Sequence, residues 1–257
     1  LVKDDENPAL ALGGLTRGVS NLELTQAFSA IANGGELEKA KFFCKIVDQD
    51  GKVLIDTTED KPTQVMKAST AYLLTDAMKE SMESNRAFAS DVRVGSTSTR
   101  AHFDGMSQAG KSGTTSNNRD IWFIGYTPYY IGGVWGGCDD NQVLKDAKTG
   151  EYNGGTGFHK DIWRKIMTKI HEGKTDPGFS KPEDIVEAQV CRKSGKLPTS
   201  GCYQDYRGSA VITELFAKGT VPTEKCTYHT SWGAMLVPEN LRDLDTDDHY
   251  YSYKEPE

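Results

Sequence analysis

Two strand-forming segments that follow one another almost without interruption constrain the fold of this chain most strongly. Residues 121–126 (IWFIGY) and 129–135 (YYIGGVW) are rich in aromatic and β-branched side chains. Only Thr127 and Pro128 separate them, which predicts a tight turn between antiparallel neighbours. The preceding segment, 109–115, can also extend, because its threonines favour strands and its glycines permit close approach of a ligand. We therefore predict a three-stranded antiparallel run whose first strand is an edge.

The same edge segment contains a competing motif. Residues 105–112 (GMSQAGKS) match the pattern G-x-x-x-x-G-K-[ST] of phosphate-binding loops. Such a loop needs a buried strand before it and, after it, a helix whose first N–H groups hold the phosphates. Here residues 96–104 are polar, and residues 113–118 are poor helix formers. The context favours the edge strand, and nucleotide binding remains an alternative that a titration with magnesium nucleotide would decide.

Helices and a hairpin are predicted around this region. Ser20 and Glu23 form a capping box, which indicates a helix that ends near residues 33–35. Segments 42–47 and 53–55 flank a turn and predict a β-hairpin. Apolar residues at helical spacing predict a second helix over 69–84.

A third predicted helix, 158–170, is strongly amphipathic. Apolar residues repeat in it every four positions at 158, 162, 166 and 170, with Trp163 and Met167 alongside. His159 and His171 are expected at its surface. Proline and glycine in 176–182 mark a linker, so we predict one domain over 1–175 and a small extension over 176–257, with an acidic tail.

The composition excludes several partners. The chain has 257 residues, 37% of them hydrophobic, and a net charge of −7. It has no basic run of the kind that binds nucleic acid. The longest strongly apolar run, 121–124, is far too short to span a bilayer. We expect a folded chain that contacts neither nucleic acid nor, through this segment, a membrane.

The polar run Lys111-Ser112-Gly113-Thr114 carries the candidate chemistry. An edge strand offers free backbone N–H groups to an extended peptide. A lysine, two hydroxyls and exposed amides together suit a carboxylate and a developing oxyanion. For so short a run taken by itself, a polar turn is the alternative.

The longer stretch AGKSGTTSNNRDIWFIGYTPYYIGGVWGG resembles the third active-site motif of penicillin-binding proteins and the two strands that follow it. The tail, CRKSGKLPTSGC to TEKCTYH, is similar to that of the bifunctional class A members, and the likeness covers roughly residues 8–230. It implies an α+β fold, an antiparallel sheet flanked by helices and incomplete in this chain, with a small β- and loop-rich extension. It also implies a serine D,D-transpeptidase that cross-links peptidoglycan stem peptides ending in D-Ala-D-Ala and is acylated by β-lactams.

The resemblance assigns roles to individual residues of the motif. Lys111 would supply positive potential and help to move protons, and the backbone N–H of Thr114 would be an oxyanion donor. The hydroxyls of Ser112 and Thr114 would hold the substrate carboxylate, with Gly113 and Thr115 also lining the site. Three residues after the motif are expected to shape the sheet rather than to react: Asp120, Trp122 and Tyr126.

Two motifs of the family are missing. No Ser-x-x-Lys occurs in the chain, and the only Ser-x-Asn, residues 116–118, follows the lysine motif instead of preceding it. We expect both motifs in an N-terminal half that precedes Leu1, on the same protein or as a separate chain. The alternative is a non-catalytic homologue that binds peptidoglycan or β-lactams. The resemblance places the protein at the extracytoplasmic face of the bacterial cell membrane, anchored by a segment absent from this chain.

The five cysteines leave one question open. Cys44 and Cys138 lie in strand-like contexts and are expected to be free and packed. Four residues near the C-terminal end could form a structural zinc site: Cys191, Cys202, Cys226 and His229. The long spacing between the first two of these, and the wall-facing compartment implied by the resemblance, favour a disulfide instead. We predict no cofactor, with zinc and one disulfide as open alternatives.

Overall fold

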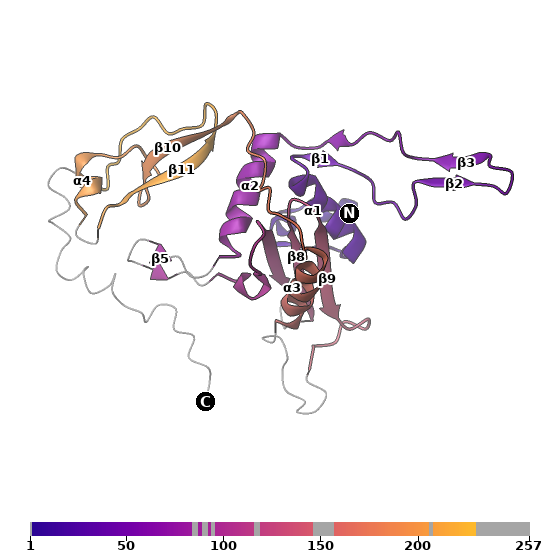
Figure 1. Cartoon of the computed structure of the whole chain (residues 1–257). Coiled ribbons are helices and arrows are strands. Elements are labelled where there is room, and N and C mark those ends of the chain that lie inside the picture. The colour runs from indigo at the N-terminus through magenta and orange to yellow at the C-terminus, as the bar shows by residue number, and fades with distance from the viewer. Residues whose placement is uncertain are drawn as a thin grey trace. The chain divides into compact units, whose positions relative to one another are not determined.

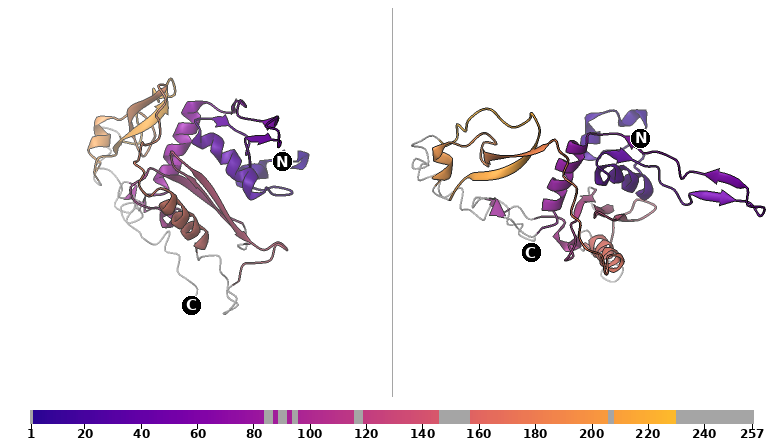
Figure 2. Two further views of the ribbon diagram at one scale, coloured as in Figure 1. Left: turned by 45° about the vertical axis from the view of Figure 1, so that its right-hand side comes forward. Right: turned by 45° about the horizontal axis from the view of Figure 1, so that its top comes forward.

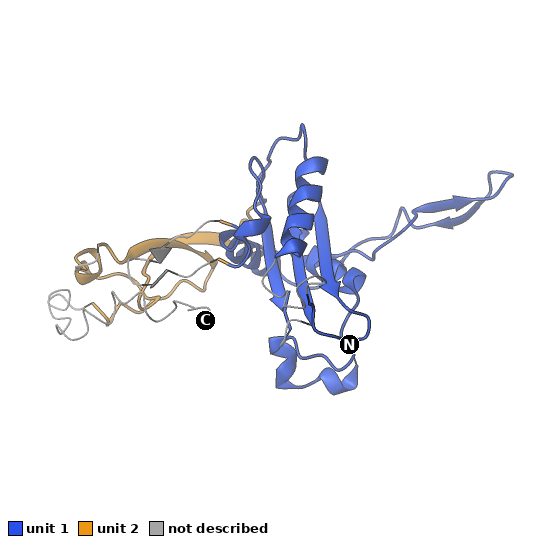
Figure 3. Ribbon diagram, turned by 90° about the horizontal axis from the view of Figure 1, so that it is seen from below, with its two compact units in different colours: residues 1–82, 97–180 blue, residues 83–96, 181–257 orange. Residues whose placement is uncertain are grey.

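The structure is a computed structural model of the whole chain and describes residues 2–83, 87–88, 92–93, 96–115, 119–145, 157–205 and 208–229. The chain divides into two compact units, residues 1–82 with 97–180 and residues 83–96 with 181–257 (Figure 3). The domain division predicted after residue 175 stays a prediction. In the described part of the chain, no helix is both long and apolar enough to cross a bilayer.

The described elements are short helices and strands that pair in antiparallel fashion (Figure 1). In chain order they are η1 (Lys3–Asp5), η2 (Pro8–Leu12), α1 (Asn21–Ala32), β1 (Glu36–Leu37), β2 (Lys45–Val47), β3 (Val53–Asp56), β4 (Thr63–Gln64), α2 (Ala68–Glu80), β5 (Ala87–Phe88), β6 (Val92–Arg93), η3 (Thr99–Ala101), β7 (Ala109–Thr114), β8 (Asp120–Tyr126), β9 (Ile131–Gly137), α3 (Phe158–Ile170), β10 (Ile185–Cys191), α4 (Ser200–Tyr203) and β11 (Val211–Ala217).

The first unit is built on the sheet β7-β8-β9, in which both neighbouring pairs are antiparallel. The predicted three-stranded run is therefore confirmed. The tight turn between β8 and β9 is closed by the Thr127 N–H, which donates to the Tyr130 carbonyl over 2.9 Å. The Thr127 hydroxyl accepts from the N–H groups of Tyr129 and Tyr130 and lies 2.8 Å from the Nε2 atom of His171.

Helices cover both faces of this sheet. On one face, Phe28 and Ile31 of α1 and Met78 of α2 pack with Tyr126 of β8. On the other face, α3 lies along the strands and packs its Trp163 against Phe123 (Figure 2). Side chains alternate along a strand, so each face of β8 serves one of these two cores.

The predicted helix α3 is confirmed, and of its apolar residues Trp163 and Met167 form the buried stripe. Ile162, Ile166 and Ile170 are 43%, 53% and 41% exposed, whereas Trp163 is 1% exposed. His159 and His171, expected at the surface, are 3% and 6% exposed. The bulky indole sits over glycines of the sheet, and its Nε1–H donates to the carbonyls of residues 125 and 132. That fit decides which stripe of the helix faces inward.

The N-terminal elements follow the predicted patterns with one exception. The Ser20 hydroxyl accepts from the Glu23 N–H over 3.2 Å, and the Glu23 carboxylate accepts from the Ser20 N–H over 2.8 Å, which confirms the capping box of α1. β2 and β3 form the predicted hairpin. Cys44, however, is exposed rather than packed, because it precedes a hairpin whose side chains are largely exposed.

The second unit contains a two-stranded antiparallel ribbon. β10 and β11 pair in register from Ile185 opposite Ala217 to Cys191 opposite Val211. A small buried cluster lies at the Cys191 end of this ribbon. Its buried members are Cys191, Cys202, Ala210 and Cys226.

Candidate active site and candidate metal centre

The motif predicted to carry the chemistry lies on β7, at the edge of the three-stranded sheet. β7 pairs with β8 on one side, and no described strand pairs with its other side. Lys111, Gly113 and Thr114 are exposed, and Ser112 is half-buried. The structure therefore presents the motif on an open strand edge.

The hydrogen-bond pattern shows which backbone groups face that edge. The Thr115 N–H donates to the Asp120 carbonyl over 3.0 Å, which makes these two residues a hydrogen-bonded pair. Bonded and non-bonded pairs alternate in an antiparallel ladder, so the N–H groups of Lys111 and Gly113 point to β8. Those of Ser112 and Thr114 point to the free edge.

Two side chains support this assignment, because each donates to a carbonyl that the alternation places at the free edge. The Ser81 hydroxyl donates to the Gly110 carbonyl over 2.7 Å, and Lys111 Nζ donates to the Ser112 carbonyl over 2.7 Å. The side chains of Ser112 and Thr114 lie on one face of the strand, since residues two apart share a face. The Ser112 hydroxyl also donates to Thr97 Oγ1 over 3.1 Å.

The surroundings of the motif carry positive charge. Burial, and then the charges of Arg100 and Lys111, lower the pKa of Lys160 at the start of α3. Arg100 is itself held by Asp161, with Nε–Oδ1 and Nη2–Oδ2 distances of 3.0 and 2.5 Å. That bidentate pair largely neutralises Arg100, which leaves Lys111 and Lys160 to attract an anionic ligand.

Thr115 and Asp120, at the adjoining ends of β7 and β8, bind one another. The Asp120 N–H donates to Thr115 Oγ1 over 2.8 Å, and Trp135 Nε1 donates to the Asp120 carboxylate over 2.9 Å. These contacts give Thr115 and Asp120 a role in shaping the sheet edge, and a substrate contact of Thr115 stays a prediction. The Ser-x-Asn at 116–118 lies outside the described residues.

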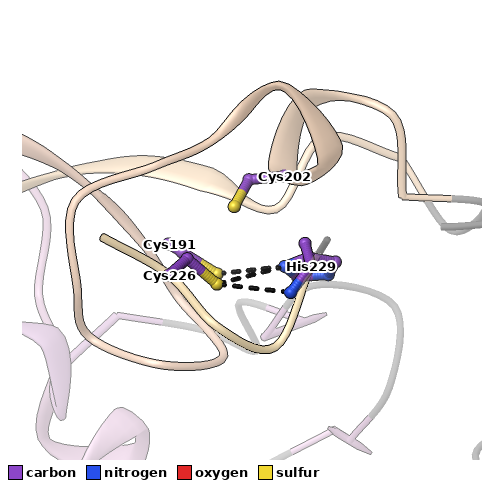
Figure 4. A group of neighbouring side chains, drawn as sticks. All are labelled: Cys191, Cys202, Cys226 and His229. Carbon is purple, nitrogen blue, oxygen red and sulfur yellow. Dashed lines mark hydrogen bonds between the residues drawn. The ribbon is translucent and has the colours of Figure 1, made fainter. Parts of the chain in front are cut away.

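The second unit brings together the four residues considered for zinc. The three cysteine sulfurs and a ring nitrogen of His229 all lie within 4.8 Å of one another, and all four residues are buried (Figure 4). His229 Nδ1 is 3.3 Å from Cys191 Sγ and 3.7 Å from Cys226 Sγ. The five cysteines form no disulfide in the structure.

Polar neighbours orient this cluster. His229 Nε2 lies 2.6 Å from Asp205 Oδ2, and both side chains are buried. The backbone N–H of Thr199 donates to Cys202 Sγ over 3.3 Å, and that of His229 donates to Cys226 Sγ over 3.4 Å. An N–H bond to sulfur favours the thiolate, the state in which thiols bind metals, and it opposes the effect of burial.

The thiols of the cluster differ in acidity. Burial raises the pKa of Cys202, as do its contacts with Cys226 and Cys191, and its bonds with Thr199 only partly oppose this rise. At Cys226 burial also favours the neutral thiol, but hydrogen bonds with Ser194, His229 and Cys191 outweigh it and lower the pKa to about 6.

Comparison with known proteins identifies the family. Residues 7–155, more than half of the chain, match the family described as the penicillin binding protein transpeptidase domain. The chain belongs to this family. Residues 181–231 also match the family described as the C-terminal domain of penicillin-binding protein 1A. The resemblance found on the Lys111 motif and on the tail is therefore confirmed.

The chain corresponds to part of its longer penicillin-binding relatives. It is 34% identical over 223 residues to penicillin-binding protein 1A of Clostridium novyi (strain NT), covering 87% of this chain and 24% of that protein. The chain thus spans about a quarter of that relative's length.

Two solved structures of penicillin-binding proteins share the fold. Penicillin-binding protein 1A from Haemophilus influenzae matches with a TM-score of 0.63 and 24% identity, over 81% of this chain and 33% of that one. PonA1 from Mycobacterium tuberculosis in complex with penicillin V matches with a TM-score of 0.53 and 25% identity, over 70% and 46%. The predicted fold, an antiparallel sheet flanked by helices in the manner of this family, is confirmed.

Several residues at both sites were not found from the sequence. Thr97, Arg100 and Lys160 lie near the motif in space but carry no local pattern that marks them. Asp205 precedes His229 by 24 positions, and no spacing rule links an acidic residue to a histidine so far away. Only the fold brings these groups together.

Proposed function

We propose that this chain supplies the edge-strand side of the active site of a serine-type D,D-transpeptidase, acting on peptidoglycan stem peptides that end in D-Ala-D-Ala and acylated by β-lactams. The observation that carries the proposal is the outward N–H of Thr114 on the open edge of β7, beside the hydroxyls of Ser112 and Thr114. The family membership restricts the chemistry to acyl transfer.

The backbone of β7 suits the acyl-transfer step. A tetrahedral intermediate places negative charge on the former carbonyl oxygen, and a fixed N–H donor stabilises that charge more than it stabilises the substrate. The N–H of Thr114 is fixed by the β7–β8 ladder, so it needs no reorganisation during the reaction. An extended peptide can also pair with this edge as an added strand.

The side chains of the motif suit the substrate's negative end. The hydroxyls of Ser112 and Thr114 share one face of β7 and would donate to the carboxylate of the terminal D-Ala, with Gly113 between them permitting close approach. Lys111 adds positive potential and, on this proposal, helps to protonate the leaving amine. Thr115 would line the end of the same strand edge.

The nucleophile must come from elsewhere. No Ser-x-x-Lys occurs in the 257 residues, and an acyl-enzyme requires an activated nucleophile. We propose that it lies in a preceding segment with Ser-x-Asn, either in the same protein or as a partner chain. That protein would act at the extracytoplasmic face of the bacterial membrane, held there by an anchor outside this chain.

The test compares β-lactam acylation of variants of the full-length protein. Lys111→Ala should lower the second-order rate of labelling by a fluorescent penicillin by about 100-fold or more, since it removes both electrostatic and proton-transfer assistance. Lys169→Ala is the matched control, because that lysine is 76% exposed on α3 and pairs only with Glu172 among the described residues. Labelling of Lys111→Ala at the wild-type rate would refute the proposal.

A non-catalytic wall-binding homologue is the second candidate, and it rests on the missing Ser-x-x-Lys. It predicts reversible binding of penicillin without a covalent bond. Intact mass spectrometry of the full-length protein after incubation with penicillin separates the two. A covalent adduct of one penicillin excludes the non-catalytic candidate, and an unmodified mass excludes the transpeptidase.

A further inference from the structure

We infer that the second unit holds one structural zinc ion, bound by the sulfurs of Cys191, Cys202 and Cys226 and by Nδ1 of His229. Three sulfurs and one imidazole are a donor set that zinc takes in closed structural sites. The four donor atoms already lie within 4.8 Å of one another. They come from β10, from α4 and from the turn that ends at His229, three segments separated in the sequence.

The distances fit a tetrahedral ion with little movement. Bonds of about 2.3 Å to sulfur and 2.0 Å to nitrogen place the donors of a tetrahedral site roughly 3.5–4 Å apart. Nδ1 of His229 is 3.3 Å from Cys191 Sγ and 3.7 Å from Cys226 Sγ. Figure 4 shows Cys202 on the other side of the space that these atoms surround. With all four donors within 4.8 Å of one another, each pair needs to approach by no more than about 1 Å.

Asp205 gives the histidine the tautomer that a metal requires. Its carboxylate can only accept a hydrogen bond when ionised, so Nε2 of His229, 2.6 Å away, carries the proton. Nδ1 then has a free lone pair, and it points at the sulfurs. A carboxylate behind a ligating histidine is a recurrent feature of zinc sites.

A disulfide would explain the positions of the four side chains less well than a zinc ion does. Joining any two of the three sulfurs would leave the third thiol and the Nδ1 lone pair with at most one hydrogen bond between them, whereas an ion engages all four donors. The buried cluster of this unit consists largely of the same cysteines, with Ala210 and the half-buried Val211. A core this small is typical of units that depend on a metal or a disulfide for stability.

The decisive experiment measures metal in the 257-residue chain purified with reductant and without added chelator. We expect one zinc per chain by inductively coupled plasma mass spectrometry. Replacement by Co²⁺ should give thiolate-to-cobalt charge-transfer bands and the visible bands of a tetrahedral ion. Cys202→Ser should lose the metal, whereas Cys44→Ser, which changes an exposed thiol, should keep it.

Two further measurements keep the inference testable if Cys202→Ser does not fold. Asp205→Asn should weaken zinc affinity by about 10- to 100-fold, because it perturbs only the residue behind the histidine. Removing zinc from the wild-type chain should speed hydrogen exchange in residues 185–229 and leave β7–β9 unchanged. The second readout separates this site from the proposed transpeptidase function, which rests on the first unit.

Three outcomes would overturn the inference. One is a folded, reduced chain that retains no zinc and binds none on titration. Another is a metal-free chain, purified without reductant, whose mass is lower by two hydrogens, which indicates a disulfide. The third is bound zinc that persists in both Cys202→Ser and His229→Ala, which places the ion elsewhere.

Discussion

Gly125→Ala should destabilise the first unit, because the sheet has no room for a side chain at this position of β8. A Cβ added there would stand 2.6 Å from Trp163 Cζ2 and 2.9 Å from Phe123 Cε1. Both rings are buried, at 1% and 0% exposure, so neither can swing away into solvent. The indole is also tied by its Nε1–H to the carbonyls of residues 125 and 132, at 3.2 and 3.1 Å.

The expected cost combines two effects. Overpacking a dense core costs about 1–3 kcal/mol. Displacing the indole weakens its hydrogen bonds to the two carbonyls, which adds about 1 kcal/mol. The free energy of unfolding should therefore fall by about 2–4 kcal/mol. For a protein of this size each kcal/mol shifts Tm by roughly 2–4 °C, so Tm should drop by about 4–16 °C.

Gly113→Ala is the matched control for the thermal unfolding assay. Among the described residues, its added Cβ would meet the Cβ of Trp122 at 3.5 Å, which is an ordinary contact. Replacing a strand glycine there should leave Tm nearly unchanged or raise it slightly, because alanine restricts the unfolded chain. Differential scanning calorimetry of both variants measures the difference. A Tm of Gly125→Ala within about 1 °C of the wild type would contradict the packing argument.

Three further changes test buried polar groups. Burial, and then the charges of Lys160 and Arg100, lower the pKa of His159 from its usual value of about 6.5 to about 4. Between these two pH values the histidine binds a proton in the unfolded state but not in the folded state, so stability should fall as the pH drops from 6.5 to 4. Tm measured against pH should show a smaller fall for His159→Phe. Tyr126→Phe removes a 2.7 Å hydrogen bond with Thr75 and should cost about 1 kcal/mol in urea unfolding. Thr127→Val removes the hydroxyl that pairs with Nε2 of His171 and with the N–H groups of Tyr129 and Tyr130. It should cost about 1–3 kcal/mol in the same assay and exceed the cost of Tyr126→Phe.

The three-stranded sheet could be predicted from the sequence because the patterns that indicate it are local. Two aromatic and β-branched runs with a two-residue connection leave few arrangements besides an antiparallel pair, and β8 and β9 pair over their full length. The capping box of α1 is likewise a signal confined to Ser20 and Glu23. Each of these features is fixed by neighbours within a few positions.

The face of α3 could not be predicted in the same way. The isoleucines at 162, 166 and 170 are as apolar as Trp163. Periodicity alone therefore indicates two adjacent apolar stripes on the helix and does not decide which one is buried. The choice depends on the shape of the sheet, whose glycines leave space for an indole and not for a branched chain. The sequence did group Cys191, Cys202 and Cys226 as possible metal ligands, but their spacing alone could not decide between zinc and a disulfide, because their mutual positions depend on the fold of the second unit.

The match of residues 105–112 to a phosphate-binding loop shows how backbone direction decides what a motif can bind. In such a loop successive N–H groups converge on one phosphate from the start of a helix. Here residues 109–114 form β7, so the N–H groups alternate between opposite sides, and those of Lys111 and Gly113 are used by β8. The outward N–H groups of the motif, at Ser112 and Thr114, are spaced two residues apart along the strand edge. Two N–H groups so spaced cannot converge on one phosphate. They do match an extended peptide, in which the carbonyl groups of every second residue face the same side.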